Sequence, residues 1–160
     1  MSAFIGEFDC KVDAKGRVMM PSGLRKQLDP EAQETFVLNR GFEKCLVLYP
    51  RNVWSGISNE ISKLNQYKKK NREFIRYFYR GASELSLDGT GRILFPKRLM
   101  SYAGIGKEVV LFAYFDRIEV WDKNTYENLL TDEPEDFSNL AEDVMGDLES
   151  KEEESNDDLS

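Results

Sequence analysis

Short apolar runs separated by Asp, Gly, Asn and Pro recur along the first 130 residues, and in residues 7–12 and 84–87 apolar and polar positions alternate. Alternation with a period of two predicts short, half-buried strands, and the intervening Gly- and Asp-containing stretches predict turns. Strands are expected over residues 7–12, 18–20, 35–39, 45–49, 84–87, 93–95, 108–113 and 117–121. Helices are expected over residues 22–28, 52–79, 97–103 and 124–130, and a break near Gln66 could divide the longest. The pattern predicts a mainly β fold with short helices.

The pattern also repeats within the chain. Residues 13–24 are Asp-Ala-Lys-Gly-Arg-Val-Met-Met-Pro-Ser-Gly-Leu, and residues 88–99 are Asp-Gly-Thr-Gly-Arg-Ile-Leu-Phe-Pro-Lys-Arg-Leu. Asp, Gly, Arg, Pro and Leu recur in the same order, with three apolar residues between Arg and Pro in both copies. Further along, Leu-Val-Leu-Tyr at residues 46–49 matches Ile-Glu-Val-Trp at residues 118–121. Matches in the same order indicate an internal duplication.

Each copy offers about four short strands and one small helix, which is too little surface to bury a stable core alone. We therefore expect residues 1–66, including a closing helix, to form a first half and residues 67–130 to form a second half packed on it. A sheet shared between the halves would give one domain with a pseudo-twofold axis inside the chain. The remaining residues, 131–160, differ in composition.

Charge separates the body of the chain from its tail. Residues 131–160 hold 13 acidic residues against Lys151 alone, whereas residues 1–130 hold 21 basic and 16 acidic residues, a net charge of +5. A basic body with an acidic appendage is typical of proteins that bind a polyanion. The tail has too few apolar residues to offset the entropy of ordering, so we expect it to be disordered. An amphipathic stretch at residues 137–148 could form a helix on a partner.

The motif Asp-x-x-Gly-Arg occurs once in each copy, beginning at Asp13 and at Asp88. These aspartates are suited to cap a turn, and Gly16 and Gly91 are suited to supply a positive φ. On a purely structural interpretation, the arginine that ends each motif pairs with the aspartate of its own turn.

The basic residues around the first motif favour a second interpretation. Lys11, Lys15 and Arg17 would form a narrow basic ridge on a hairpin, and a two-stranded ribbon of this kind fits the major groove of DNA. Arg17 is the expected base contact, because arginine can bind a guanine edge with two hydrogen bonds, and the two lysines are expected on phosphates. In the second motif only Arg92, a further predicted DNA contact, is basic. We expect the first copy to have diverged toward ligand contact and the second toward packing.

At these residues the chain resembles the MraZ family. The matching segments fall in the family's order and are Gly6-Glu-Phe, Asp13-Ala-Lys-Gly-Arg17 followed by Pro21, Cys45-Leu-Val-Leu-Tyr-Pro50, Trp54, Phe78-Tyr-Arg-Gly-Ala82, Asp88-Gly-Thr-Gly-Arg92-Ile-Leu-Phe-Pro96 and Asp116-Arg-Ile-Glu-Val-Trp121. The resemblance covers about residues 1–130 and includes both copies of the repeat. Thr90 and the acidic tail depart from the family's pattern.

The resemblance implies a fold similar to the AbrB-like swapped-hairpin barrel, with both halves in one chain. It implies a ring-shaped homo-oligomer that binds short direct repeats in double-stranded DNA, in the promoter of the division and cell wall gene cluster, and regulates transcription there. Such a regulator is expected in the cytoplasm and associated with the nucleoid. The basic residues of the first copy resemble the family's DNA contacts.

A second basic stretch, Lys68-Lys-Lys-Asn-Arg72, continues to Arg76 and Arg80 with aromatic residues in between. At helical spacing the arginines lie along one face, and Phe74 and Phe78 lie along another. We interpret the aromatic face as core or subunit interface rather than as a platform for stacking bases. The charged face could be solvated, could contact phosphates or could receive the acidic tail.

The chain contains no histidine, which removes Ser-His and Cys-His nucleophile pairs and the commonest zinc sites. Asp13 and Asp88 could act as a carboxylate pair only if the two turns faced each other, and no nucleophile or phosphate-binding glycine loop accompanies them. Cys10 and Cys45 are interpreted as buried small side chains. We therefore expect a protein that binds without chemistry and needs no cofactor or metal. No apolar run approaches the roughly 20 residues of a membrane span, and no secretory signal is expected.

An alternative function belongs to a different class. AbrB-like folds also serve as antitoxins and assembly scaffolds, and the acidic tail could bind a protein partner. A partner that needs the tail, together with a body that does not bind DNA, would favour this interpretation.

Overall fold

The computed structural model describes residues 3–28, 35–131 and 136–157. The chain divides into two compact units, Met1–Tyr126 and Glu127–Ser160. The strands are β1 (Phe4–Lys11), β2 (Arg17–Met19), β3 (Thr35–Arg40), β4 (Leu46–Pro50), β5 (Ser83–Ser86), β6 (Arg92–Leu94), β7 (Glu108–Phe115) and β8 (Arg117–Asp122). The helices are α1 (Ser22–Arg25), α2 (Arg51–Ser62), α3 (Lys69–Tyr79), α4 (Lys97–Tyr102), α5 (Lys123–Thr131) and α6 (Phe137–Asp157).

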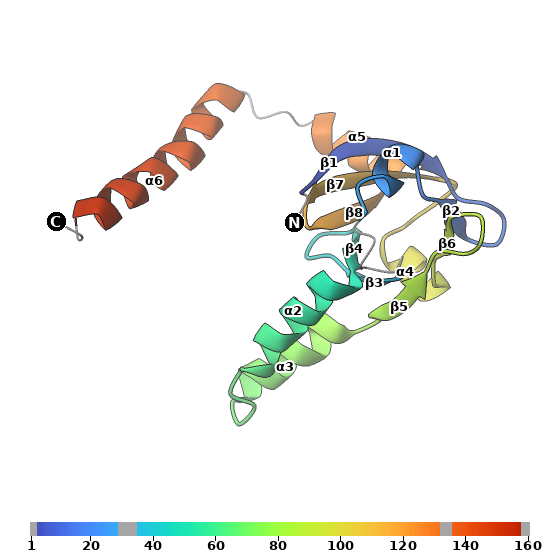
Figure 1. The fold of residues 1–160 in the computed structure, drawn as a ribbon, viewed down its shortest axis with the longest axis horizontal. Coiled ribbons are helices and arrows are strands. Elements are labelled where there is room, and N and C mark those ends of the chain that lie inside the picture. Colours follow the sequence, from blue (N-terminus) through green and yellow to red (C-terminus); the bar gives the residue numbers. More distant parts are fainter. Residues whose placement is uncertain (1–2, 29–34, 132–135, 158–160) are drawn as a thin grey trace. The chain divides into compact units, whose positions relative to one another are not determined.

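Six strands form one antiparallel sheet in the order β1-β7-β8-β4-β3-β5, and β2 pairs with β6 in a separate ribbon (Figure 1). Strands β1 to β4 come from the first copy of the repeat, and β5 to β8 are their counterparts in the second. When each strand is exchanged for its counterpart, the same order is obtained, read from the opposite edge of the sheet. A pseudo-twofold axis therefore passes between β4 and β8. The first strand of each copy pairs with the hairpin of the other copy, β1 with β7 and β5 with β3. Each half therefore completes the sheet of the other.

The ribbon of β2 and β6 closes the main core over one face of the sheet. It pairs about Val18 and Ile93, which are equivalent residues of the two copies. Both are 2% exposed and pack with Leu24 of α1 and Leu99 of α4. The sheet side of this core is formed by Phe36, Leu38, Leu46, Leu48, Val109, Leu111, Ile118 and Val120. Burial of these side chains from both copies is what holds the halves together.

Helices cover the opposite face of the sheet at two equivalent places. Trp54 of α2 packs on Tyr49 with ring centroids 5.6 Å apart, and Tyr126 of α5 packs on Trp121 with centroids 6.0 Å apart. The first place is larger, because α3 adds Phe78, which stacks on Trp54 at 5.7 Å. Since both faces of the central strands are covered, β4 is buried along its whole length.

The mainly antiparallel β architecture and the tandem duplication predicted from the sequence are confirmed. The closed barrel that the resemblance implies is not found among the described strands, because β1 and β5 end the sheet order on opposite sides and do not pair. The chain leaves both edge strands through tight turns, and β2 and β6 then pair with each other instead of closing the sheet. The division into residues 1–66 and 67–130 stays a prediction.

The helical segments follow the predicted pattern with one main difference. The helix expected over residues 52–79 is divided into α2 and α3, and the break at residues 63–68 falls around Gln66, where the sequence indicates that a break could occur. Residues 137–157 form α6, whereas the sequence predicts a disordered tail over residues 131–160. Asp136 begins this helix by accepting a hydrogen bond from the N–H of Asn139, and the residues that follow are mostly good helix formers. None of the described helices is both long and apolar enough to cross a membrane.

The two cysteines lie within the packed part of the structure. Cys45 is 2% exposed, and burial raises the pKa of its thiol to about 12. Cys10 is half-buried, and burial raises its pKa to about 11. Both therefore stay protonated near neutral pH, as expected of side chains that serve as small hydrophobic groups.

Candidate nucleic-acid interface

The first Asp-x-x-Gly-Arg motif forms a tight turn between β1 and β2 that is organised around Asp13. Its Oδ1 accepts hydrogen bonds from the backbone N–H groups of Lys15 and Arg17, at 2.9 and 2.8 Å. Its Oδ2 accepts a hydrogen bond from Nε of Arg17 at 2.7 Å. Gly16 has a φ of 87°, which a residue with a Cβ adopts only with strain. The turn is thus built by the residues that the sequence singled out.

The second motif forms the same turn between β5 and β6. Oδ1 of Asp88 accepts hydrogen bonds from the N–H groups of Thr90 and Arg92, each at 2.9 Å, and Oδ2 accepts one from Nε of Arg92 at 3.1 Å. Gly91 has a φ of 85°. The second turn adds one bond, because the hydroxyl of Thr90 also donates to Oδ1 at 2.8 Å.

These hydrogen bonds hold both aspartates in their charged form. The N–H of Arg92, together with the hydroxyl and N–H of Thr90, keeps the pKa of Asp88 well below its ordinary value of 3.8. The N–H of Arg17 is the main cause of the lowered pKa of Asp13. Each turn therefore contains an ionised carboxylate that orients the guanidinium beside it.

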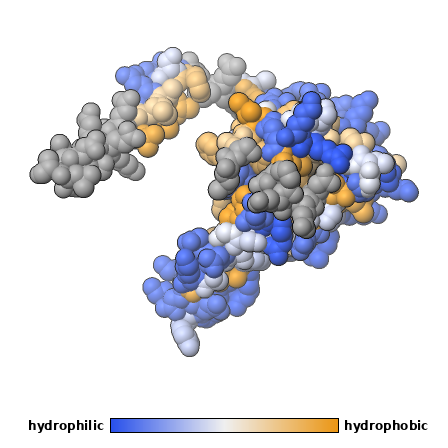
Figure 2. Space-filling model, viewed as in Figure 1, coloured by the Kyte–Doolittle hydropathy of each residue, from blue (hydrophilic) through white to orange (hydrophobic). Residues whose placement is uncertain are grey.

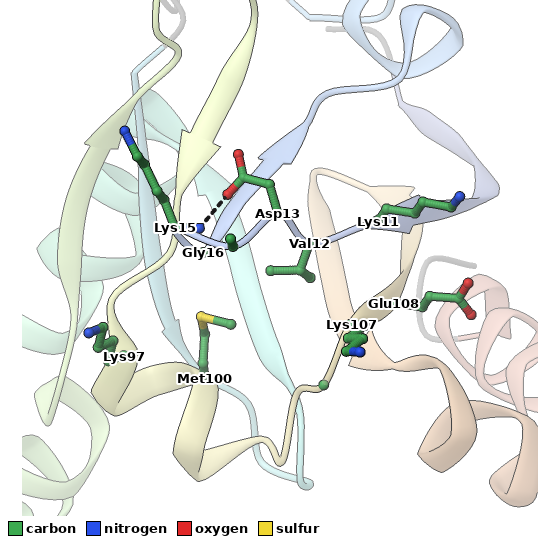
Figure 3. A pocket seen from close by; sticks show the side chains of 11 residues that line it. Lys11, Val12, Asp13, Lys15, Gly16, Lys97, Met100, Lys107 and Glu108 are labelled. Atoms are coloured by element: carbon green, nitrogen blue, oxygen red, sulfur yellow. Dashed lines mark hydrogen bonds between the residues drawn. The ribbon is translucent and has the colours of Figure 1, made fainter.

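A hollow of about 620 Å³ lies beside the first turn. Four exposed lysines surround it: Lys11, Lys15, Lys97 and Lys107. Figure 3 shows these lysines around the hollow, with the side chain of Met100 between them. We call this hollow the first-turn groove.

The charge of the first-turn groove is strongly positive, because its acidic residues are already paired. Asp13 pairs with Arg17 at 2.7 Å, and Glu108 approaches Lys123 at 3.7 Å. None of the four lysines forms an ion pair with any residue that the structure describes. Their positive charges are therefore available to an anion in solution.

The groove draws its residues from both halves of the chain. The first turn supplies Lys11 and Lys15, whereas Lys97 begins α4 and Lys107 precedes β7 in the second half. The swapped pairing brings them together, since the N–H of Val12 donates to the carbonyl of Lys107 at 2.8 Å. Lys97 and Lys107 are not among the site residues predicted from the sequence. Aligning the repeat under the assumption of swapped halves would have placed them beside the first turn.

The second turn carries less positive charge although its backbone hydrogen bonds are the same. At the positions equivalent to three of the groove lysines it holds Ser86, Thr90 and Ser22. Arg25 of α1 stands where Met100 of α4 stands at the first turn. The two turns thus form a matched pair in which one is rich in lysine and the other is not.

The structure does not bring all the predicted site residues together. Arg17 lies beside the first-turn groove, with 28% of its side chain exposed. Arg92 starts β6, and the antiparallel register pairs it with Met19 at the far end of β2. The two turns therefore lie at opposite ends of the ribbon, and Asp13 and Asp88 do not form the facing carboxylate pair considered from the sequence.

The fold and this site together define a class of protein. It consists of two fused halves that exchange their first strands, with a duplicated Asp-Gly-Arg turn of which one copy is surrounded by lysines. A family model described as MraZ protein, antitoxin-like, matches the chain twice, over residues 3–77 and 78–148. The second match extends past residue 130, where the resemblance noted in the sequence ends.

Three relatives are similar over nearly their whole length, and each is called Transcriptional regulator MraZ. The relative from Christiangramia forsetii is 48% identical over 91% of this chain and 95% of its own length. The relative from Flavobacterium psychrophilum is 46% identical over 92% of this chain and 95% of its own length. The relative from Pediococcus pentosaceus is 37% identical over 89% of this chain and 96% of its own. The chain belongs to the MraZ family.

Proposed function

We propose that the chain is a DNA-binding transcriptional regulator and that the first-turn groove contacts the DNA. The observation that carries the proposal is the concentration of four lysines around one of two equivalent turns, where the other turn holds serine and threonine at three of these positions and has Arg25 against Gly91. The name shared by the relatives, Transcriptional regulator MraZ, supports the same function.

In the proposed complex Arg17 contacts a base edge, and Lys11 and Lys15 contact phosphates. The pair with Asp13 uses one of the five N–H donors of the Arg17 guanidinium and fixes its orientation. A side chain that is already oriented loses less entropy on binding. Lys97 and Lys107 extend the phosphate-binding rim from the second half. Binding of this kind involves no chemistry, so the protein is proposed to act without catalysis or a cofactor.

The wider proposal concerns the assembly and its target. Because each chain presents one lysine-rich turn, a single chain would bind DNA weakly. A ring-shaped homo-oligomer that engages successive short direct repeats would gain a hundredfold or more through avidity, on the order expected for linked sites. We propose that these repeats lie in the promoter upstream of its own gene, in the division and cell wall gene cluster. The protein would then act in the cytoplasm at the nucleoid.

The assignment to the first turn is tested by comparing Arg17→Ala with Arg92→Ala. Both variants remove the same Asp–Arg pair from equivalent turns, so any cost to folding is matched. The account expects Arg17→Ala to lose about 1–3 kcal/mol of binding per engaged subunit and to relax sequence preference. Arg92→Ala should lose less. Equal losses would mean that both turns contact DNA, and unchanged binding by Arg17→Ala would refute the assignment.

A second candidate function, binding a protein partner through the acidic tail, is favoured by one feature of α6. Phe137, Leu140, Val144 and Leu148 recur every three or four residues and are exposed, between 45% and 71%. Acidic side chains occupy other positions of the same helix. A stoichiometric protein partner that requires residues 131–160, found together with no DNA binding by residues 1–130, would replace the first proposal with this one.

A further inference from the structure

The α2–α3 hairpin carries a second concentration of positive charge, far from the first-turn groove. Figure 1 shows the hairpin projecting from the sheet at the end away from the β2–β6 ribbon. Residues 58–80 contain seven basic and two acidic residues, a net charge of +5. This equals the net charge of all residues 1–130, so the rest of the body is neutral overall. In Figure 2 the surface of the hairpin is largely hydrophilic toward its tip.

The cations of the hairpin are aligned along α3. Lys68, Arg72, Arg76 and Arg80 follow one another at intervals of four residues, and all four are exposed. Arg72 and Arg76 lie within α3, about 6 Å apart along its axis, and Lys68 and Arg80 flank the helix as its N-cap and C-cap residues. The four cations thus form a row from one end of α3 to the other. We call it the α3 basic row. Lys69 and Lys70 add charge at its beginning.

Few of these charges are neutralised within the protein. The two acidic residues of the hairpin approach Lys63 at 3.1 Å and Lys69 at 3.9 Å. Among the residues that the structure describes, no carboxylate forms an ion pair with Lys68, Lys70 or Arg76.

The arrangement is unfavourable for the isolated helix. Like charges four residues apart repel each other, and cations in the first turn oppose the helix dipole. The first turn of α3 contains no acidic residue. A polyanion along the row would remove these costs.

The C-terminal end of α3 is anchored to β3 and α2 by hydrogen bonds. Nδ2 of Asn39 donates to the carbonyl of Phe78 at 2.7 Å, and Nη2 of Arg40 donates to that of Tyr77 at 2.8 Å. At the same end, the hydroxyls of Ser58 and Tyr79 are 2.6 Å apart. Because the helix is anchored in this way, binding a regular line of anions does not have to order its backbone.

We propose that the α3 basic row is a second nucleic-acid site, which binds the phosphate backbone of double-stranded DNA without regard to sequence. Duplex DNA carries about one negative charge per 1.7 Å of its axis, so the row can follow several phosphates. Because the hairpin projects away from the first-turn groove, it contacts DNA outside the bases that Arg17 contacts. The site extends the proposed function but does not depend on recognition of any particular sequence.

The test compares two double variants on a scrambled DNA duplex, with the full-length chain and a series of salt concentrations. Lys68→Gln with Lys70→Gln removes two charges from the hairpin, and Lys26→Gln with Lys44→Gln removes two exposed lysines elsewhere. The hairpin variant should bind about tenfold more weakly at low salt, and its salt slope should fall by about 1 to 2, as expected for two lost phosphate contacts. Its melting temperature should be no lower, because it relieves repulsion.

Equal affinities and salt slopes for the two double variants would overturn the proposal. The α3 basic row would then be solvated or would bind an acidic protein segment. The result is separate from that for the proposed function. If the wild type prefers upstream DNA while the hairpin variant matches its control, only the proposal of a second site is refuted. If the wild type shows no preference while the hairpin variant loses scrambled-DNA binding, only the proposed function as a sequence-specific regulator is refuted.

Discussion

Single side chains determine the geometry of both turns. Each motif aspartate accepts two backbone N–H groups and one arginine Nε–H, so one carboxylate joins the start and the end of its turn. An uncharged carboxyl group would be a weaker acceptor for all three donors. The protonation state of Asp88, whose pKa lies well below 3.8, is therefore linked to folding.

The sign of this linkage can be tested in acid. A carboxyl group whose pKa is lower in the folded state contributes stability above its unfolded pKa and loses it as pH falls toward the folded value. The free energy of unfolding should therefore fall below about pH 4, and Asp88→Asn should make this fall shallower. Urea unfolding at several pH values measures both curves. The exposed Asp143 offers a control, and Asp143→Asn should follow the wild type. Parallel curves for Asp88→Asn and the wild type would contradict the linkage.

At the scale of elements, two glycines differ in what a substitution by alanine would do: at one it would strain the backbone, and at the other it would favour a helix. Gly16 needs a φ of 87°, and a Cβ there would lie 3.4 Å from Sδ of Met100. Gly56 lies in α2 with open space around it. Gly16→Ala should lose about 1–2 kcal/mol of folding free energy because of the left-handed conformation. Gly56→Ala should gain about 0.5–1 kcal/mol because alanine favours the helix. Thermal unfolding of both variants checks the opposite signs, and a stabilising Gly16→Ala would contradict the turn geometry.

The elements themselves could be predicted from the sequence, because alternation and turn residues are local signals. The eight strands, the break near Gln66 and the duplicated turns all follow from nearby residues. The partners of the strands could not be predicted in this way. Pairing of β1 with β7 joins residues about a hundred positions apart, and no local pattern records it. For the same reason Lys97 and Lys107 were absent from the predicted site.

At the scale of the whole molecule, the pseudo-twofold fold is asymmetric in charge. The two copies share strand order, core positions and turn geometry, yet lysines gather at one turn and along one hairpin. The excess of acidic over basic residues lies instead in residues 131–160, which hold 13 acidic residues and one lysine. Stability alone does not account for this separation of positive and negative charge, because surface charges contribute little to stability.

Deletion of residues 131–160 should strengthen nonspecific DNA binding. The deletion changes the net charge from −7 to +5, so long-range repulsion from DNA is replaced by attraction. Affinity for a scrambled duplex should rise on the order of tenfold at low salt, and the gain should shrink as salt screens the charges. A full-length variant with the tail's acidic residues changed to Asn and Gln should behave like the deletion. Unchanged affinity in both would contradict an electrostatic role of the tail.

The most direct test of the central claim is a titration of the purified, full-length protein with DNA from upstream of its own gene, beside a scrambled duplex, at two salt concentrations. The account predicts tight binding to the upstream DNA that weakens with salt, and far weaker binding to the scrambled duplex. Equal weak binding to both would leave only a basic surface without sequence recognition. No binding to either would contradict the DNA-binding account and favour a protein partner.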